Sequence, residues 1–148
     1  YAGQLAVLGN RHSASRSIRH MAAQEQRHLD RFNAMMAERG VRPTLLQPFW
    51  HVAGFALGAV TAAIGPEAAM ACTAAIETEI DQHYGEQLEA LGSDDAELSE
   101  AIAEFRSEEV EHKATALAEG AERAPAYPLL SATIRLGCRM AIQLSKRI

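Results

Sequence analysis

Two stretches of this chain repeat apolar residues at steps of three and four, and a Glu-x-x-His pair interrupts the centre of each repeat. The first repeat runs through Ile18, Met21, Glu25, His28, Phe32 and Met35. The second runs through Leu98, Ile102, Phe105, Glu109, His112 and Ala116. Steps of three and four place these side chains on one face of a helix, as in the core seam of a helical bundle. The pattern therefore predicts two core helices that each direct a carboxylate and an imidazole inward.

A third helix seam carries one acidic residue at its middle. It runs through Met70, Thr73, Glu77, Ile80, Tyr84 and Leu88. Burying a carboxylate without a partner is costly, so seams that bury Glu25, Glu77 and Glu109 need compensating cations. A solvated polar face is the alternative, but it does not explain the Phe and Met residues that flank the pairs. We therefore predict a metal site with the ligands Glu25, His28, Glu77, Glu109 and His112.

The ligand types and their spacing indicate which metal is bound and where a further ligand lies. Mixed carboxylate and imidazole ligands favour iron or manganese, because structural zinc prefers thiolate and imidazole. A two-metal site in a four-helix bundle uses two Glu-x-x-His pairs and one Glu from each of two other helices. Glu77 precedes Glu109 by 32 residues, which places the fourth carboxylate about seven residues before Tyr1 if the hairpins are related. We expect this chain to bind iron weakly or unevenly without that ligand.

Helix-forming residues dominate and no segment alternates like a β-strand, so the predicted fold class is all-α. We expect helices over residues 1–9, 13–39, 66–91, 94–122 and 128–147, with Ser93 or Asp94 capping the fourth. Residues 40–65 form a long crossover. The prediction is a single domain over residues 1–148: a ferritin-like four-helix bundle with a truncated first helix and an additional amphipathic C-terminal helix.

The distribution of charge bears on partners. The formal net charge of −5 argues against nucleic acid. Residues 128–148 nevertheless contain no acid and four cations, Arg135, Arg139, Lys146 and Arg147. Basic amphipathic helices lie in membrane interfaces and favour anionic lipid. An ordinary packing helix with a basic solvent face is the alternative. On the third helix, Glu79, Glu86 and Glu89 fall off the seam, and we expect them to be solvated.

Residues 43–66 contain no charged group apart from His51 when it is protonated, and they are long enough to span a membrane. Pro43, Pro48 and several glycines interrupt this segment, and the bundle needs a crossover here, so we reject a transmembrane helix. We expect it instead to pack on the bundle and partly enter a membrane. Phe49, Trp50 and Phe55 are therefore candidates for binding an apolar substrate.

Over almost its whole length the chain resembles the demethoxyubiquinone hydroxylases of ubiquinone biosynthesis. Besides the Glu-x-x-His pairs and Glu77, the resemblance rests on motifs at residues 1–4 (Tyr-Ala-Gly-Gln), 42–44 (Arg-Pro-Thr), 54–59 (Gly-Phe-Ala-Leu-Gly-Ala), 69–73 (Ala-Met-Ala-Cys-Thr), 83–84 (His-Tyr), 105–106 (Phe-Arg), 124–127 (Ala-Pro-Ala-Tyr) and 137–139 (Gly-Cys-Arg). It implies that Glu25 and Glu109 bridge two irons, with His28 on one and His112 and Glu77 on the other. It also implies that His83 and Tyr84 lie beside the ligands. Asp81 could orient a ligand histidine or be an exposed acid.

By this resemblance we expect a di-iron monooxygenase that uses O₂ and electrons derived from NAD(P)H to hydroxylate the quinol ring of a demethoxyubiquinone precursor. A polyprenyl quinone is insoluble in water, so the enzyme would collect it as a peripheral protein at a membrane. That membrane would be the cytoplasmic face of a bacterial inner membrane, or the matrix side of the mitochondrial inner membrane if the chain is eukaryotic. A lipid-presenting protein and other enzymes of ubiquinone biosynthesis are expected partners. The alternatives are a ferritin-like di-iron oxidase or peroxidase that acts on iron or H₂O₂, and a metal-free lipid-binding helical module.

Overall fold

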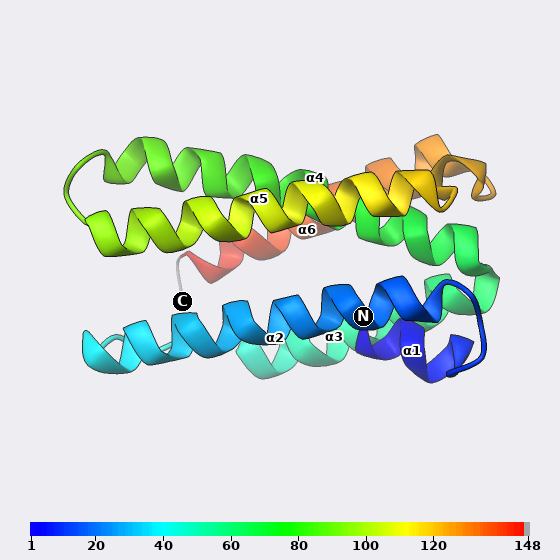
Figure 1. Cartoon of the computed structure of the whole chain (residues 1–148), viewed down its shortest axis with the longest axis horizontal. Coiled ribbons are helices and arrows are strands. Elements are labelled where there is room, and N and C mark those ends of the chain that lie inside the picture. The colour runs from blue at the N-terminus through cyan, green and yellow to red at the C-terminus, as the bar shows by residue number, and fades with distance from the viewer. Residues whose placement is uncertain (147–148) are drawn as a thin grey trace.

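The computed structural model describes residues 1–146, and these residues form helices joined by loops. The elements are α1 (Ala2–Leu8), α2 (Ser15–Glu38), α3 (Gln47–Ile64), α4 (Pro66–Leu91), α5 (Ala96–Ala118), the 3₁₀ helix η1 (Ala121–Arg123) and α6 (Tyr127–Ser145). Figure 1 shows α1, α2 and α3 on one side of the molecule and α4, α5 and α6 on the other. No β-strand occurs among these residues, so the predicted all-α class is confirmed. Of the four cations predicted for the last helix, Arg147 lies outside the described residues.

The helix boundaries follow the breakers in the sequence, with two differences around α5. The side chain of Asp95 accepts a hydrogen bond from the Leu98 backbone N–H, so Asp95 caps α5 in place of Ser93 or Asp94. α5 also ends a turn earlier than expected. Gly120 adopts a left-handed conformation with φ 98°, which redirects the chain into η1.

The crossover, in which proline and glycine predict interruptions, is largely a helix. Pro48 lies in the first turn of α3, where the missing backbone N–H is tolerated. The glycines bring α3 close to α1. A side chain on Gly3 would collide with the carbonyl oxygen of Phe55, and a Cβ on Gly58 would lie 3.2 Å from the Gln4 backbone nitrogen. These small residues therefore set the distance between two helices and do not end either of them.

None of the helices within residues 1–146 combines the length and the hydropathy needed to cross a membrane. α3 packs against α1 and α4. The outer face of α3 exposes a series of large apolar side chains, namely Phe49, Val52, Phe55, Val60 and Ile64. α6 adds Leu129, Leu136, Met140 and Leu144. Most of the large apolar side chains exposed in the described chain thus lie on α3 and α6.

A buried carboxylate on α4 attaches α6 to the bundle. Glu79 is only 2% exposed, so the prediction that it is solvated is wrong. Its Oε1 accepts a hydrogen bond of 2.5 Å from Arg135 Nε, and Arg139 Nε lies 3.1 Å from its Oε2. The burial is tolerated because two guanidinium groups compensate the charge. Two of the cations on α6 therefore pair with Glu79 and do not contribute to a free basic face.

Among the described residues, two apolar clusters lie along the α2, α4 and α5 seams with a polar layer between them, and a third cluster, of Cys72, Ala75 and Ile134, packs α4 against α6. Buried members of the first cluster include Ile18, Met21, Met70, Ala74 and Ala116. The second is built from Met35, Ala101 and Phe105, with Phe32, Tyr84 and Leu98 packed against them. The Glu and His residues of the α2, α4 and α5 seams come between these clusters in the sequence. The fold therefore places them in the interior, with apolar side chains on both sides.

Candidate metal centre

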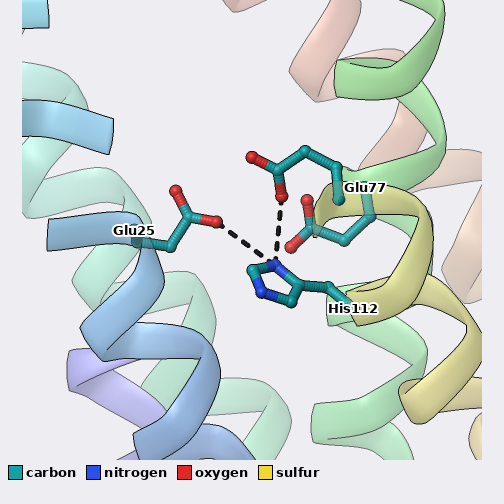
Figure 2. A group of neighbouring side chains, drawn as sticks. Glu25, Glu77 and His112 are labelled. Atoms are coloured by element: carbon teal, nitrogen blue, oxygen red, sulfur yellow. Dashed lines mark hydrogen bonds and ion pairs between the residues drawn. The ribbon is translucent and has the colours of Figure 1, made fainter. Parts of the chain in front are cut away.

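Side chains from three helices converge in the polar layer. Glu25 of α2, Glu77 of α4, and Glu109 and His112 of α5 each offer one ligand atom, and these four atoms lie within 4.8 Å of one another. Glu77, Glu109 and His112 are buried, and Glu25 is half-buried. Figure 2 shows the side chains of Glu25, Glu77 and His112 pointing toward one another from different helices. The fold thus brings together four of the five residues predicted as ligands.

The fifth residue, His28, contacts two of the same carboxylates. Its Nδ1 lies 3.2 Å from Glu109 Oε1 and 3.7 Å from Glu25 Oε2. The Nδ1 of His112 lies 3.1 Å from Glu109 Oε2 and 3.5 Å from Glu25 Oε1. Glu25 and Glu109 therefore lie between the two imidazoles, and each has one oxygen near each ring. Glu77 groups with His112.

Four atoms of this cluster are buried and have no hydrogen-bond partner within residues 1–146. They are Glu25 Oε1, His28 Nδ1, Glu77 Oε2 and Glu109 Oε1. Each buried polar atom left unpaired costs about 1–3 kcal/mol, so a group of four in one place has the character of a ligand set. Carboxylate oxygens combined with imidazole nitrogens suit iron or manganese. The chemistry of this donor set therefore fits a metal site.

The carboxylates and histidines shift one another's pKa values. Burial lowers the pKa of His28, but the neighbouring carboxylates, Glu109 first among them, more than offset this and raise the pKa to about 10. The same balance raises the pKa of His112 to about 9. Burial alone would raise the pKa of Glu109, but the two histidines lower it to about 2. Burial and neighbouring carboxylates raise the pKa of Glu77 well above its usual range. Metal binding would therefore displace protons from these groups.

Tyr1, at the N-terminal cap of α1, also contacts the centre, although the sequence alone assigns it no role. Its hydroxyl donates a hydrogen bond of 2.6 Å to Glu77 Oε1. Burial, followed by the charge of Glu77, raises the pKa of this phenol. Tyr1 therefore stays protonated and keeps its role as donor.

Two further residues, which the apolar seams also do not identify, contact the histidines. Gln24 Oε1 lies 3.0 Å from His112 Nε2, and Glu108 Oε2 lies 2.7 Å from His28 Nε2. Each directly precedes the glutamate of a Glu-x-x-His pair. Their place directly before these glutamates is the sequence feature from which Gln24 and Glu108 could have been predicted.

The other residues expected beside the ligands, His83, Tyr84 and Asp81, make no hydrogen bond to a predicted ligand within residues 1–146. Tyr84 packs against Phe32 with ring centroids 6.4 Å apart, and burial, then the cluster carboxylates, raise the pKa of its hydroxyl. His83 lines a pocket beside α6, and within residues 1–146 no hydrogen bond joins it to a predicted ligand. Asp81 accepts a hydrogen bond of 2.6 Å from Arg106 Nε, so it orients an arginine and not a histidine.

A cavity of about 240 Å³ lies beside the cluster, between α1, α3 and α4. Its lining includes Tyr1, Gln4, Glu25, Gly54, Gly58, Thr73, Ile76, Glu77 and Ile80. The aromatic candidates on α3 do not line this cavity: Phe49 and Phe55 are exposed, and Trp50 donates a hydrogen bond of 2.8 Å to Ser145 Oγ. From α3 the lining consists of Gly54 and Gly58, and at Gly54 the missing side chain leaves open space.

Comparison with known proteins identifies the family. The family model described as "Ubiquinone biosynthesis protein COQ7" matches residues 1–145. The chain is 53% identical over 148 residues to a 3-demethoxyubiquinol 3-hydroxylase of Rhodospirillum rubrum, covering 100% of this chain and 70% of the relative. It is 50% identical over 152 residues to the mitochondrial NADPH-dependent 3-demethoxyubiquinone 3-hydroxylase of Homo sapiens, with the same coverage of 100% and 70%. It is 38% identical over 164 residues to the mitochondrial 5-demethoxyubiquinone hydroxylase of Saccharomyces cerevisiae, again covering 100% and 70%. The resemblance found in the sequence is confirmed, and the chain belongs to the COQ7 family of ubiquinone biosynthesis proteins.

Proposed function

We propose that this chain uses O₂ to hydroxylate the ring of a demethoxyubiquinol precursor. The relatives described above are named for hydroxylation of demethoxyubiquinol or demethoxyubiquinone. The observation that carries the proposal is the convergence of three carboxylates and an imidazole, with their ligand atoms within 4.8 Å of one another. In the net reaction one ring C–H bond becomes C–OH. The second oxygen atom leaves as water after taking up two electrons and two protons.

The proposed cofactor is a pair of iron ions. Glu25 and Glu109, each of which has one oxygen near each imidazole, would hold the ions together with His28, His112 and Glu77. Bound iron supplies the redox chemistry that activates O₂. The chain itself supplies geometry: ligands come from three packed helices, apolar clusters flank the polar layer on both sides, and Glu77, Glu109 and His112 are buried in it.

We place the quinol ring in the cavity beside the cluster, because its lining joins apolar walls to the predicted ligand Glu77. A test is Gly54→Leu, since a Cβ at Gly54 meets nothing within 4 Å and the longer side chain would fill the cavity without a backbone clash. We expect KM for a short-chain quinol to rise at least several-fold. Gly137→Leu on α6 is the matched control, because a Cβ there is equally unhindered and Gly137 does not line the cavity. Equal KM values for the two variants would contradict this placement.

We further propose that the protein binds a membrane surface peripherally, through the exposed apolar residues of α3 and α6. Because Arg135 and Arg139 pair with Glu79, attachment should depend mainly on apolar burial and only weakly on anionic lipid. Flotation with vesicles of neutral and of anionic lipid tests this. Phe49→Ser combined with Val52→Ser should reduce binding to both, whereas Arg42→Ser, an exposed residue before α3, should not. Binding that requires anionic lipid, or no binding at all, would contradict the proposal.

The activity is tested with iron-loaded protein, a short-chain demethoxyubiquinol, NAD(P)H as the proposed electron source, and ¹⁸O₂. We expect a ring-hydroxylated product that contains one ¹⁸O atom, and no such product from Glu77→Gln. A wild-type protein with two irons and no hydroxylated product would contradict the proposal. Oxidation of added Fe²⁺ or consumption of H₂O₂ under those conditions would instead favour a ferritin-like oxidase or peroxidase.

The cellular setting follows from the substrate. A polyprenyl quinone resides in a bilayer, so we propose the cytoplasmic face of a bacterial inner membrane, or the matrix side of the mitochondrial inner membrane, as the place of action. A lipid-presenting protein and other enzymes of ubiquinone biosynthesis are the proposed partners. Co-purification of the untagged protein with such enzymes from detergent-solubilised membranes would support this.

A further inference from the structure

Each ligand histidine is contacted, through its second ring nitrogen, by a residue of the opposite helix. Gln24 of α2 contacts His112 of α5, with Oε1 3.0 Å from Nε2. Glu108 of α5 contacts His28 of α2, with Oε2 2.7 Å from Nε2. The two contacts are equivalent in position, because both partners directly precede the glutamate of a Glu-x-x-His pair. They therefore cross the interface between α2 and α5 in both directions.

These contacts determine which nitrogen of each ring can bind a metal ion. Amide and carboxylate oxygens accept hydrogen bonds, so the Nε2 of each histidine must carry a proton and donate. The Nδ1 of each ring then faces Glu109, at 3.2 Å from His28 and 3.1 Å from His112. A histidine whose outer N–H donates to an oxygen is held in one tautomer and one orientation as a metal ligand.

The two outer partners differ in charge. Gln24 is a neutral amide, whereas Glu108 is a carboxylate that Arg27 holds in place, with Nη2 at 2.9 Å and 3.2 Å from its two oxygens. A carboxylate partner raises the basicity of an imidazole ligand more than an amide does. His28 and His112 are 3% and 2% exposed, so water does little to screen this difference.

We propose that Gln24 and Glu108 are positioning residues for the metal centre, and that their unequal charge makes His28 a stronger metal donor than His112. The inference rests on the proposed metal site, and it concerns residues that touch the ligands and not the metal. It implies two metal positions with different electronic properties, even though the two Glu-x-x-His pairs are alike in sequence.

The test is titration of the metal-free protein with Co²⁺, followed by visible absorption. We expect Glu108→Ala and Gln24→Ala to weaken Co²⁺ binding about 10- to 100-fold. Glu108→Gln keeps an acceptor and removes the charge, so its loss should be about tenfold or less and its absorption bands should shift. Gln24→Glu adds charge and keeps the acceptor, so it should strengthen binding. Glu104→Ala, an exposed residue one turn earlier on α5 that contacts neither histidine, should bind Co²⁺ like wild type.

The variants distinguish positioning from general effects on charge or folding. Equal losses in Glu108→Ala and Glu108→Gln would overturn the positioning role, because the amide should rescue it. Unchanged affinity in all variants would overturn the inference while the wild-type titration still supports the proposed metal centre. A wild-type protein that binds no Co²⁺ would overturn both. Gln24→Glu guards against misfolding as an explanation, because a gain in affinity cannot come from a damaged fold.

Discussion

The hydroxyl of Tyr1 lies 2.6 Å from Glu77 Oε1, a contact between residues 76 positions apart. Burial, followed by the charge of Glu77, raises the pKa of the Tyr1 hydroxyl, so at neutral pH the phenol keeps its proton and donates a hydrogen bond to Glu77. The bond holds Glu77 on the side of the cluster that faces the cavity, which both residues line. Tyr1 thus connects the proposed substrate cavity to the proposed metal ligand.

Tyr1→Phe should destabilise the metal-free protein, because it leaves Glu77 Oε1 buried without a donor. We expect the free energy of unfolding, measured with urea in the presence of a chelator, to fall by about 1–3 kcal/mol. Tyr127→Phe is the control: its ring is half-buried in the same apolar cluster, and its hydroxyl makes no hydrogen bond within residues 1–146. A similar loss in both variants would mean that the Tyr1 hydroxyl does not matter.

Glu77 and Glu79, two positions apart on α4, should respond differently to replacement by glutamine. Glu77→Gln removes a proposed ligand and should weaken iron binding about tenfold or more. Glu79→Gln should leave iron binding unchanged but lower the free energy of unfolding by about 1–3 kcal/mol, because Arg135 and Arg139 lose their partner. Iron content and thermal unfolding of the two variants provide the measurements. Equal iron loss from both would argue that Glu77 acts through general charge.

The metal-free protein should lose stability as the pH rises above neutrality. The pKa values of His28 and His112 are raised from 6.5 to about 10 and about 9, so the folded state binds these protons more tightly than the unfolded chain does. Their contribution is complete below pH 6.5 and is lost as the pH rises through the folded-state values. We therefore expect the free energy of unfolding to fall between pH 6.5 and 10. Urea unfolding at several pH values, with a chelator present, measures it.

His28→Gln should flatten this pH dependence, whereas His20→Gln, at an exposed position of the same helix, should not. Iron binding should show the opposite trend and tighten as the pH rises, because metal ions and protons compete for the same ligands. A free energy of unfolding that is the same at pH 7 and pH 10 would contradict the raised pKa values.

Close approach of α1 and α3 should make Gly3 intolerant of a side chain. Gly3→Ala places a Cβ against the Phe55 carbonyl and should cost about 1–3 kcal/mol of unfolding free energy. Gly137→Ala, in a helical position where a Cβ meets nothing within 4 Å, should instead stabilise by about 0.5–1 kcal/mol. Both are measured by thermal or urea unfolding. A neutral Gly3→Ala would show that the two helices can separate without cost.

The α-helices other than α3, and the inward faces of three of them, could be predicted from the sequence, because helical periodicity is local. Steps of three and four place Glu25, Glu77 and Glu109 on core faces whatever the helices pack against. Local periodicity does not predict α3, and the sequence indicates a crossover there instead of a helix. Its glycines lower helix propensity by about 1 kcal/mol each, and only the contact of Gly3 and Gly58 with the facing helix shows why a helix forms there.

By itself, the sequence determined the all-α class, the four-helix pattern and the residues that converge in the polar layer. The tertiary structure alone decided which residues contact them: Tyr1 hydrogen-bonds to Glu77, Gln24 contacts His112, and Glu108 contacts His28. It also decided that two arginines of α6 pair with Glu79. The physical reason is that each of these contacts joins different helices. Nothing in the sequence near Glu79 distinguishes a carboxylate that meets an arginine from one that meets water, because its partners lie 56 or more positions away.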